Sequence, residues 1–226
     1  MNKKAILLGA SGAIGNSLLL LLLENKYYAE VLILVRKELK IQHPKLKQLA
    51  IDFDKISDYA GEISGDVVFC CLGTTKNKTP NEQQYRKIDY QYPLEAAGIA
   101  ARNGVQSYHL VSSIGADKNS SVFYTRTKGE VECDLQAIPF KNIHIYRPSL
   151  LDATRKDKRF MEGSISIIMQ VVNPILIGKW RKYRSINVEN VARAMVRASL
   201  EDYPGVYIHE SDEIQKMSDA EVVNFS

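Results

Sequence analysis

Apolar runs long enough for a single strand alternate along this chain with longer stretches that carry apolar residues at helical spacing. Most of the short runs are continuously apolar, as in parallel strands that are covered on both faces. They predict strands at 4–8, 31–35, 48–51, 66–72, 107–111, 143–146 and 206–209. The longer stretches predict helices at 13–24, 80–102 with a bend near Pro93, 125–138 and 187–200. This alternation predicts an α/β fold with a doubly wound, mostly parallel sheet.

A glycine-rich turn joins the first predicted strand to the first predicted helix. Gly9 permits the tight turn, Gly12 lets a pyrophosphate approach the backbone, and Gly15 lets the helix pack on the strand. The helix start offers free N–H groups and a positive dipole end to phosphates. The turn therefore predicts dinucleotide binding in a Rossmann-type fold, and the alternative is a merely structural turn. The predicted cofactor-binding residues here are Gly9, Ser11, Gly12, Ala13, Ile14 and Gly15.

The residues that end the second strand indicate which dinucleotide is preferred. A fold that prefers NAD(H) usually carries an acid there for the ribose 2′-hydroxyl, whereas this chain has Arg36 and Lys37. A guanidinium suits a 2′-phosphate, so we expect NADP(H) rather than NAD(H). The alternative is a solvated charge pair at a strand end. Further along the cleft we expect Asp52 beside the adenine and Leu72, Gly73 and Thr74 close to the cofactor.

A proton-transfer set follows the fifth predicted strand. Tyr124 and Lys128 stand four residues apart, so their side chains share one helix face. The tyrosine hydroxyl is the candidate acid or base, and the lysine ammonium favours its phenolate form and can hold the nicotinamide ribose. A serine at the strand end can polarise a substrate carbonyl. Ser113 is the first candidate for that role and Ser112 the second, because alternation at a strand end does not tell which one points inward. The alternative is a surface tyrosine and a solvated lysine.

Several spaced motifs resemble one known family. These are Phe69-Cys-Cys-Leu-Gly-Thr-Thr75, Ser112-Ser-Ile-Gly-Ala-Asp-Lys-Asn-Ser120, Lys128-Gly-Glu-Val-Glu132, Arg147-Pro148 and Ile186-Asn-Val-Glu-Asn-Val-Ala192. Together with the glycine turn they resemble the Tat-interacting-protein branch of the atypical short-chain dehydrogenase/reductases, over most of residues 1–200. The resemblance implies NADP(H) binding and a Ser/Tyr/Lys active site, and it adds Ser112, Lys128, Arg147 and Pro148 to the cofactor-binding residues. Some members of this branch are known for regulatory partner binding.

Composition narrows the class of protein further. A length of 226 residues suits one domain, and 45% hydrophobic with 25% charged residues is ordinary for a soluble enzyme. The net charge of +4 is too small to indicate nucleic-acid binding. Cys70, Cys71 and Cys133 show no metal-ligand spacing, so we expect no metal site and free thiols in a reducing compartment. Gly12 and Gly15 interrupt the apolar N-terminal stretch, which therefore does not look like a signal peptide, and we expect a cytoplasmic protein.

Substrate specificity is expected beyond the carboxyl edge of the sheet, in elements around 152–186 and 205–226 of a single domain spanning 1–226. Arg155, Arg159 and Glu162 match the polar spacing of the resembled family there, or else form an ion-pair network inside a lid. The apolar stretch 163–177 precedes a basic, tryptophan-bearing segment, 179–184, which could lie on a membrane surface. Pro174 and Gly178 interrupt it, so we expect a lid rather than membrane contact.

The sequence thus predicts an NADP(H)-dependent oxidoreductase that acts on a small carbonyl or alcohol substrate. The alternative is an NADP(H)-sensing regulatory protein that binds a partner without turnover. A small-molecule substrate is the expected partner, and a homodimer or a regulatory protein partner is compatible with the chain. The sequence names neither the substrate nor its stereochemistry.

Overall fold

A parallel sheet forms the centre of the molecule. The structure is a computed structural model that describes residues 2–152 and 184–220. Seven strands in the order β3-β2-β1-β4-β5-β6-β9 run parallel throughout. The strands are β1 (Lys3–Leu8), β2 (Tyr28–Val35), β3 (Leu46–Ala50), β4 (Val67–Cys70), β5 (Ser107–Val111), β6 (Asn142–Arg147) and β9 (Gly205–Glu210).

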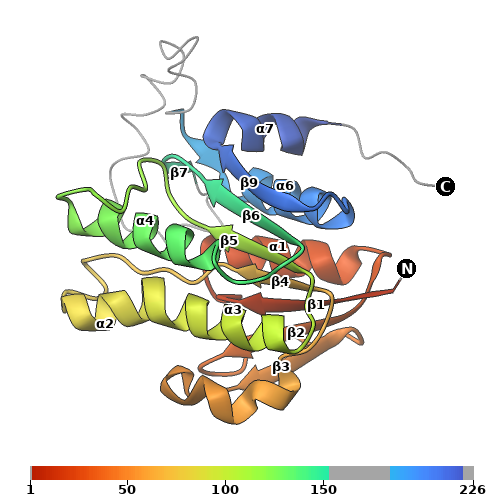
Figure 1. Cartoon of the computed structure of the whole chain (residues 1–226). Coiled ribbons are helices and arrows are strands. Elements are labelled where there is room, and N and C mark those ends of the chain that lie inside the picture. Colours follow the sequence, from red (N-terminus) through yellow and green to blue (C-terminus); the bar gives the residue numbers. More distant parts are fainter. Residues whose placement is uncertain (1, 153–183, 221–226) are drawn as a thin grey trace.

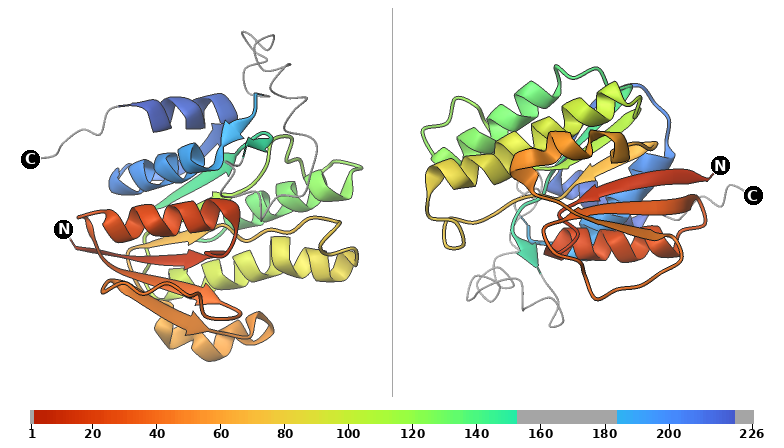
Figure 2. Two further views of the ribbon diagram at one scale, coloured as in Figure 1. Left: turned by 180° about the vertical axis from the view of Figure 1, so that it is seen from behind. Right: turned by 90° about the horizontal axis from the view of Figure 1, so that it is seen from below.

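Helices cover both faces of this sheet, which gives three layers (Figures 1 and 2). One face carries α1 (Ala13–Glu24), α6 (Val188–Leu200) and α7 (Ser211–Asp219). The other face carries the 3-10 segment η1 (Phe53–Glu62), α2 (Glu82–Arg86), α3 (Tyr92–Arg102) and α4 (Phe123–Leu135). Among the described residues, no helix is both long and apolar enough to cross a membrane.

The two faces bury separate apolar cores because successive strand residues point to opposite sides. On β1, Ala5 and Leu7 pack in the core with α1 and α6, whereas Ile6 and Leu8 pack in the core with α3 and α4. All four side chains are fully buried. A strand that is covered on both faces therefore needs the continuous apolar run seen in the sequence, and the doubly wound parallel fold predicted from these runs is confirmed.

The predicted helix over 80–102 is interrupted in a different place than expected. It consists of α2, the π-helical turn η2 (Lys87–Gln91) and α3. Pro93 lies in the first turn of α3, where its missing N–H costs no helical hydrogen bond. The irregularity therefore falls in the π turn just before the proline. This turn contains the buried residue Asp89.

The expected substrate elements lie partly outside the residues that the structure describes. Residues 153–183, with Arg155, Arg159, Glu162 and most of the basic segment, lie outside the described residues. A two-stranded parallel sheet, β7 (Leu151–Asp152) with β8 (Ile186–Asn187), joins the chain on either side of that stretch. In the described part of the range 205–226, β9 pairs with β6 as the last strand of the main sheet, where the sequence predicts a strand at 206–209, and α7 packs on α6.

A row of imidazoles lies buried on β5, β6 and β9. His109 stacks on His144, with ring centroids 4.6 Å apart and planes 7° apart, and His144 stacks on His209 at 5.4 Å. His109 is hydrogen-bonded on both ring nitrogens, to Ser107 Oγ and Tyr146 Oη, each at 3.0 Å. Burial and the neighbouring imidazole of His209 lower the pKa of His144 to about 4, and burial lowers the pKa of His109 well below its ordinary value. Both rings are therefore neutral in the folded protein near pH 7.

This row predicts acid-sensitive stability. A buried neutral histidine has a lower pKa folded than unfolded, so its contribution is complete above the unfolded value of about 6.5 and is lost as pH falls towards about 4. His144 alone corresponds to a decrease of about 3 kcal/mol in the free energy of unfolding across that window. Urea unfolding at a series of pH values should show this slope, and His109→Gln should flatten it. His43→Gln, outside the row, is the control. A His109→Gln profile that runs parallel to the wild type contradicts the assignment.

Candidate cofactor and active site

A cleft of about 720 Å³ opens where the parallel strands end. This volume is in the range of small-molecule and cofactor sites, and the carboxyl edge is where doubly wound sheets bind ligands. Residues from the glycine turn, from the ends of β2, β4 and β5, and from α2 to α4 form its wall. The predicted site residues that line it are Gly9, Ser11, Gly12, Ala13, Ile14, Arg36, Asp52, Leu72, Gly73, Thr74, Ser112, Tyr124 and Lys128.

The three glycines of the turn have different tasks. Gly9 has φ +83°, and a Cβ there would come within 2.5 Å of the Cys71 carbonyl oxygen at the end of β4. A Cβ on Gly15 would lie 2.1 Å from the Gly9 carbonyl oxygen, so this glycine allows α1 to pack on the turn. Gly12 differs, because its Cβ would meet only the Gly9 carbonyl oxygen, at 3.3 Å. The space beside Gly12 therefore belongs to the cleft rather than to the protein.

The start of α1 fits an anionic group. Gly12 is the N-cap, no side chain caps the helix, and its first turn contains no acidic residue. Ala13 and Ile14, the first residues of the helix, line the cleft. Unsatisfied N–H groups at a helix N-terminus, together with the helix dipole, bind phosphate. The turn is thus suited to the pyrophosphate of a dinucleotide.

Tyr124 and Lys128 reach the cleft from the first turns of α4, as their spacing predicts. Tyr124 is 39% exposed, whereas Lys128 is buried. The Lys128 ammonium pairs with Asp89, with Nζ–Oδ1 at 2.9 Å, and the other oxygen of Asp89 accepts the Thr74 backbone N–H at 2.9 Å. Burial alone would lower the lysine pKa, but attraction to Asp89 and Tyr124 raises it to about 12. The ammonium therefore stays charged in a buried position at the base of the cleft.

Sequence reasoning missed Asp89. The residue lies in the π turn η2, lines the cleft and is almost fully buried. A signal was present in the sequence, since Tyr85, Asp89, Tyr92 and Ala96 recur at helical spacing and the carboxylate is the one charged member of that stripe. An isolated carboxylate in an apolar stripe needs a buried partner. Gly73 lies over the pair, and a Cβ there would come within 3.5 Å of Asp89 and 3.7 Å of Lys128.

The two candidate serines differ in what their hydroxyls do. Ser112 lines the cleft, and its hydroxyl donates to the buried carboxylate of Glu132 on α4. Glu132 also accepts from the Arg147 guanidinium, which pairs with Glu210 as well. Ser113 is outside the cleft wall, and its buried hydroxyl has no hydrogen-bond partner among the described residues. Ser112 therefore lies in the cleft wall, whereas Ser113 has a hydroxyl that makes no hydrogen bond to the described residues.

Several predicted cofactor contacts are absent from the cleft wall. Arg147 pairs with Glu132 and Glu210, so its charge connects β6, α4 and the end of β9. The Pro148 carbonyl accepts from the Ile114 N–H at 3.0 Å, which fixes the loop after β5. Gly15 packs against the turn, and Lys37 is exposed beyond Arg36. These residues support the site without forming its wall.

The end of the cleft near β2 is electrostatically prepared for an anion. Arg36 is exposed and lines the cleft. The nearby carboxylates already have partners: Asp52 accepts the Asp54 N–H at 3.0 Å, and Asp54 accepts from Lys87 at 2.7 Å and from Tyr92 at 2.8 Å. Hydrogen bonds from Lys87 and then Tyr92 lower the pKa of Asp54. The Arg36 guanidinium is thus the positive group of the wall at this end.

Comparison with known proteins agrees with this geometry. A family described as NAD(P)H-binding matches residues 9–163, which include the glycine turn, Asp89, Tyr124 and Lys128. The chain belongs to this NAD(P)H-binding family, in its atypical short-chain dehydrogenase/reductase branch. Protein HTATIP2 of Rattus norvegicus is 33% identical over 199 residues, covering 86% of this chain and 80% of that protein. The mitochondrial protein FMP52 of Meyerozyma guilliermondii is 32% identical, covering 94% of each chain.

Solved structures show the same fold at low sequence identity. UDP-glucose 4-epimerase from Thermotoga maritima, with UDP-glucose, has a TM-score of 0.68 and 16% identity, covering 97% of this chain and 84% of that one. The enzyme WbmH of Bordetella bronchiseptica, with NAD⁺, has a TM-score of 0.69 and 17% identity, covering 96% and 79%. At these identities the likeness concerns the fold alone.

The glycine geometry predicts opposite outcomes for two similar substitutions. Gly12→Val should leave a folded protein that has lost NADPH binding, because the side chain enters space that the protein does not use. Gly15→Val should instead destabilise the fold, because its Cβ overlaps the Gly9 carbonyl. Calorimetric titration with NADPH and thermal unfolding separate the two effects. Normal NADPH affinity in Gly12→Val would mean that the turn is structural only.

The Lys128–Asp89 pair predicts a charge-dependent loss of stability. Asp89→Asn keeps an acceptor for the Thr74 N–H but leaves the buried ammonium unpaired, which should cost about 3–5 kcal/mol. The double variant Asp89→Asn/Lys128→Met removes both charges and should recover most of that loss. Urea unfolding measures both. If Asp89→Asn unfolds at the same urea concentration as the wild type, the pair does not hold the site together.

Proposed function

We propose that this protein is an NADP(H)-dependent oxidoreductase that moves a hydride between the cofactor and a small carbonyl or alcohol substrate. The observation that carries the proposal is the arrangement of Tyr124 and Lys128 in the wall of the same cleft as the uncapped start of α1. Membership of the NAD(P)H-binding family supports the cofactor part of the proposal. The nicotinamide would supply or accept the hydride, and the protein's own groups would move the proton.

In this proposal Tyr124 gives a proton to the developing alkoxide or takes one from an alcohol. Its side chain is the more exposed of the pair, which leaves the hydroxyl open to a substrate in the cleft. Lys128 is held in place by Asp89, so its positive charge stays beside the tyrosine throughout the reaction. Asp89 is therefore a positioning residue, which also fixes the backbone at Thr74.

The second candidate function is an NADP(H)-sensing protein that binds a partner without turnover. Two observations favour it: the Lys128 ammonium already has a carboxylate partner, and the Ser112 hydroxyl is already donated to Glu132. Under this hypothesis the charged groups stabilise a cofactor-binding fold and take no part in a reaction. Turnover of NADPH across a panel of small carbonyl compounds separates the two functions. The expected cytoplasmic location and a homodimer or protein partner stay predictions in either case.

Cofactor preference is predicted from Arg36. Arg36→Ala should weaken NADPH binding about tenfold to a hundredfold, the equivalent of about 1.5–3 kcal/mol, and leave NADH binding unchanged. Lys37→Ala is a matched control, because it removes the same charge from a neighbour outside the cleft wall. Calorimetric titration of both cofactors gives the comparison. Equal dissociation constants for NADPH and NADH in the wild type would remove the preference for NADP(H).

Tyr124→Phe tests the enzyme proposal directly. The change removes one hydroxyl, so the fold and NADPH affinity should persist while turnover falls about 10²–10⁴-fold, as for a lost general acid. The measurement is the steady-state rate on the best substrate of the carbonyl panel. A variant that keeps wild-type turnover would exclude Tyr124 as the acid or base.

The same assay assigns the serine. We expect Ser113→Ala to lower turnover more than Ser112→Ala, because of these two serines only Ser113 has a hydroxyl that no described residue binds. Ser112→Ala should mainly lower stability, since it removes a hydrogen bond from the buried Glu132 carboxylate. The reverse order would transfer the catalytic role to Ser112.

A further inference from the structure

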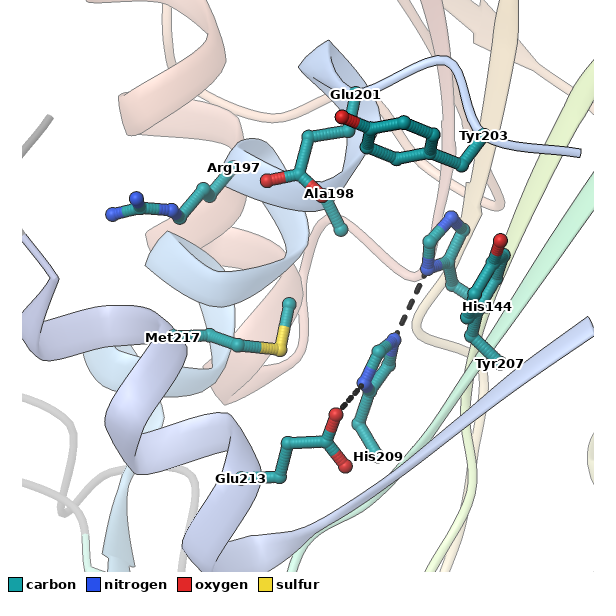
Figure 3. A pocket seen from close by; sticks show the side chains of 9 residues that line it. All are labelled: His144, Arg197, Ala198, Glu201, Tyr203, Tyr207, His209, Glu213 and Met217. Carbon is teal, nitrogen blue, oxygen red and sulfur yellow. Dashed lines mark hydrogen bonds and ion pairs between the residues drawn. The ribbon is translucent and has the colours of Figure 1, made fainter. Parts of the chain in front are cut away.

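A second cavity lies between α6, β9 and α7 and shares no residue with the cofactor cleft. Its volume is about 240 Å³. Figure 3 shows His144, Tyr207 and His209 forming one side, with Glu201 and Tyr203 on another and Glu213 and Met217 on a third. An engineered cavity of about 150 Å³ takes a benzene molecule, so this one has room for one ring with a short arm.

Two successive hydrogen bonds determine whether the nitrogen that His144 turns toward this cavity is a donor or an acceptor. Glu213 Oε1 can only accept, so it accepts a hydrogen bond from the N–H at His209 Nδ1, at 3.1 Å. In a neutral His209 the Nε2 atom is then an acceptor, and the N–H at His144 Nδ1 donates a hydrogen bond to it, also at 3.1 Å. His144 Nε2 is left bare when both imidazoles are neutral. Figure 3 shows this second nitrogen on the Tyr203 side of the pocket.

The remaining wall favours a positive ligand. Glu201 stands at the rim, and no cation pairs with it among the residues that the structure describes. Tyr203 is 67% exposed, so its aromatic face is available to a cation, and the Tyr207 ring, which stacks on His144 at 5.0 Å, is a second aromatic group of the wall. The cationic residue of the wall, Arg197, points away from the imidazoles and donates to the Ala220 carbonyl at 2.7 Å.

We propose that this cavity is a second ligand site that binds a small organic amine in its ammonium form. The ammonium donates a hydrogen bond to His144 Nε2 and lies near the Glu201 carboxylate, while the organic body packs on Tyr207 and Tyr203. A metal ion is a poorer occupant, because no group of three metal-ligating side chains is present in the described part of the chain. The proposal is independent of the chemistry assigned to the cofactor cleft.

Benzylamine is the probe, with benzyl alcohol as its neutral isostere and benzoate as its anionic counterpart. Calorimetric titration of the whole protein at about pH 8, above the ordinary histidine pKa, should show one benzylamine per chain. Benzylamine should bind about tenfold more tightly than benzyl alcohol. In a long-range ¹H–¹⁵N correlation spectrum, the ¹⁵N resonance of His144 Nε2 should shift when this nitrogen accepts a hydrogen bond. An excess of NADPH should not displace the amine.

Substitutions at the exposed rim test the site without disturbing the buried imidazoles. Glu201→Gln and Tyr203→Ala should each weaken benzylamine binding about threefold to fivefold. Glu189→Gln, at the other end of α6, is the matched control and should have no effect. Equal binding of benzyl alcohol, tighter binding of benzoate, displacement by NADPH, or no saturable binding would each overturn the proposal.

Discussion

The close approach of three backbone segments is the constraint on which the molecule depends. The turn at Gly9, the start of α1 at Gly15 and the end of β4 at Cys71 lie so near one another that one methyl group would overlap a carbonyl oxygen. This contact fixes the angle at which α1 leaves β1, and with it the direction of the uncapped N–H groups. The glycine turn and the first residues of α1, which line the cleft, take their positions from this contact.

A second constraint is electrostatic and ties the helical layer to the sheet. Lys128, Asp89 and the Thr74 backbone connect α4, the π turn and the loop after β4. A second connection joins α4 to the ends of β5 and β6, where Glu132 binds Ser112 and Arg147. Two charged clusters on one helix thus hold the far wall of the cleft, where an apolar contact would leave the side chains free to rotate. These contacts fix the position of α4 against the sheet.

The sequence predicted the elements that must be apolar because they are buried, and it missed elements that bury few apolar residues. Parallel strands that are buried on both faces read as apolar runs, and β5 and α1 begin and end at the predicted residues. The two-residue strands β7 and β8 carry no periodicity, and α7 buries only Ser211 and Ile214, so neither gave a signal. At the site, Tyr124 and Lys128 followed from spacing within one helix. Asp89 stands in an apolar stripe that helical spacing shows, but its pairing with Lys128 and the hydrogen bonds of the serines depend on contacts between elements far apart in sequence, which periodicity does not encode.

The pairing of β7 with β8 has a consequence for how this architecture diversifies. Leu151 pairs with Ile186, and Leu151 also lines the cleft, so these two points of the chain lie next to each other beside the site. The entropy of closing a connection rises only slowly with its length once its ends are joined. Insertions, deletions or wholesale exchange between these two strands therefore cost the sheet little. The sheet and the wall of the cleft can therefore keep their structure when the connection between these two strands changes in length or sequence.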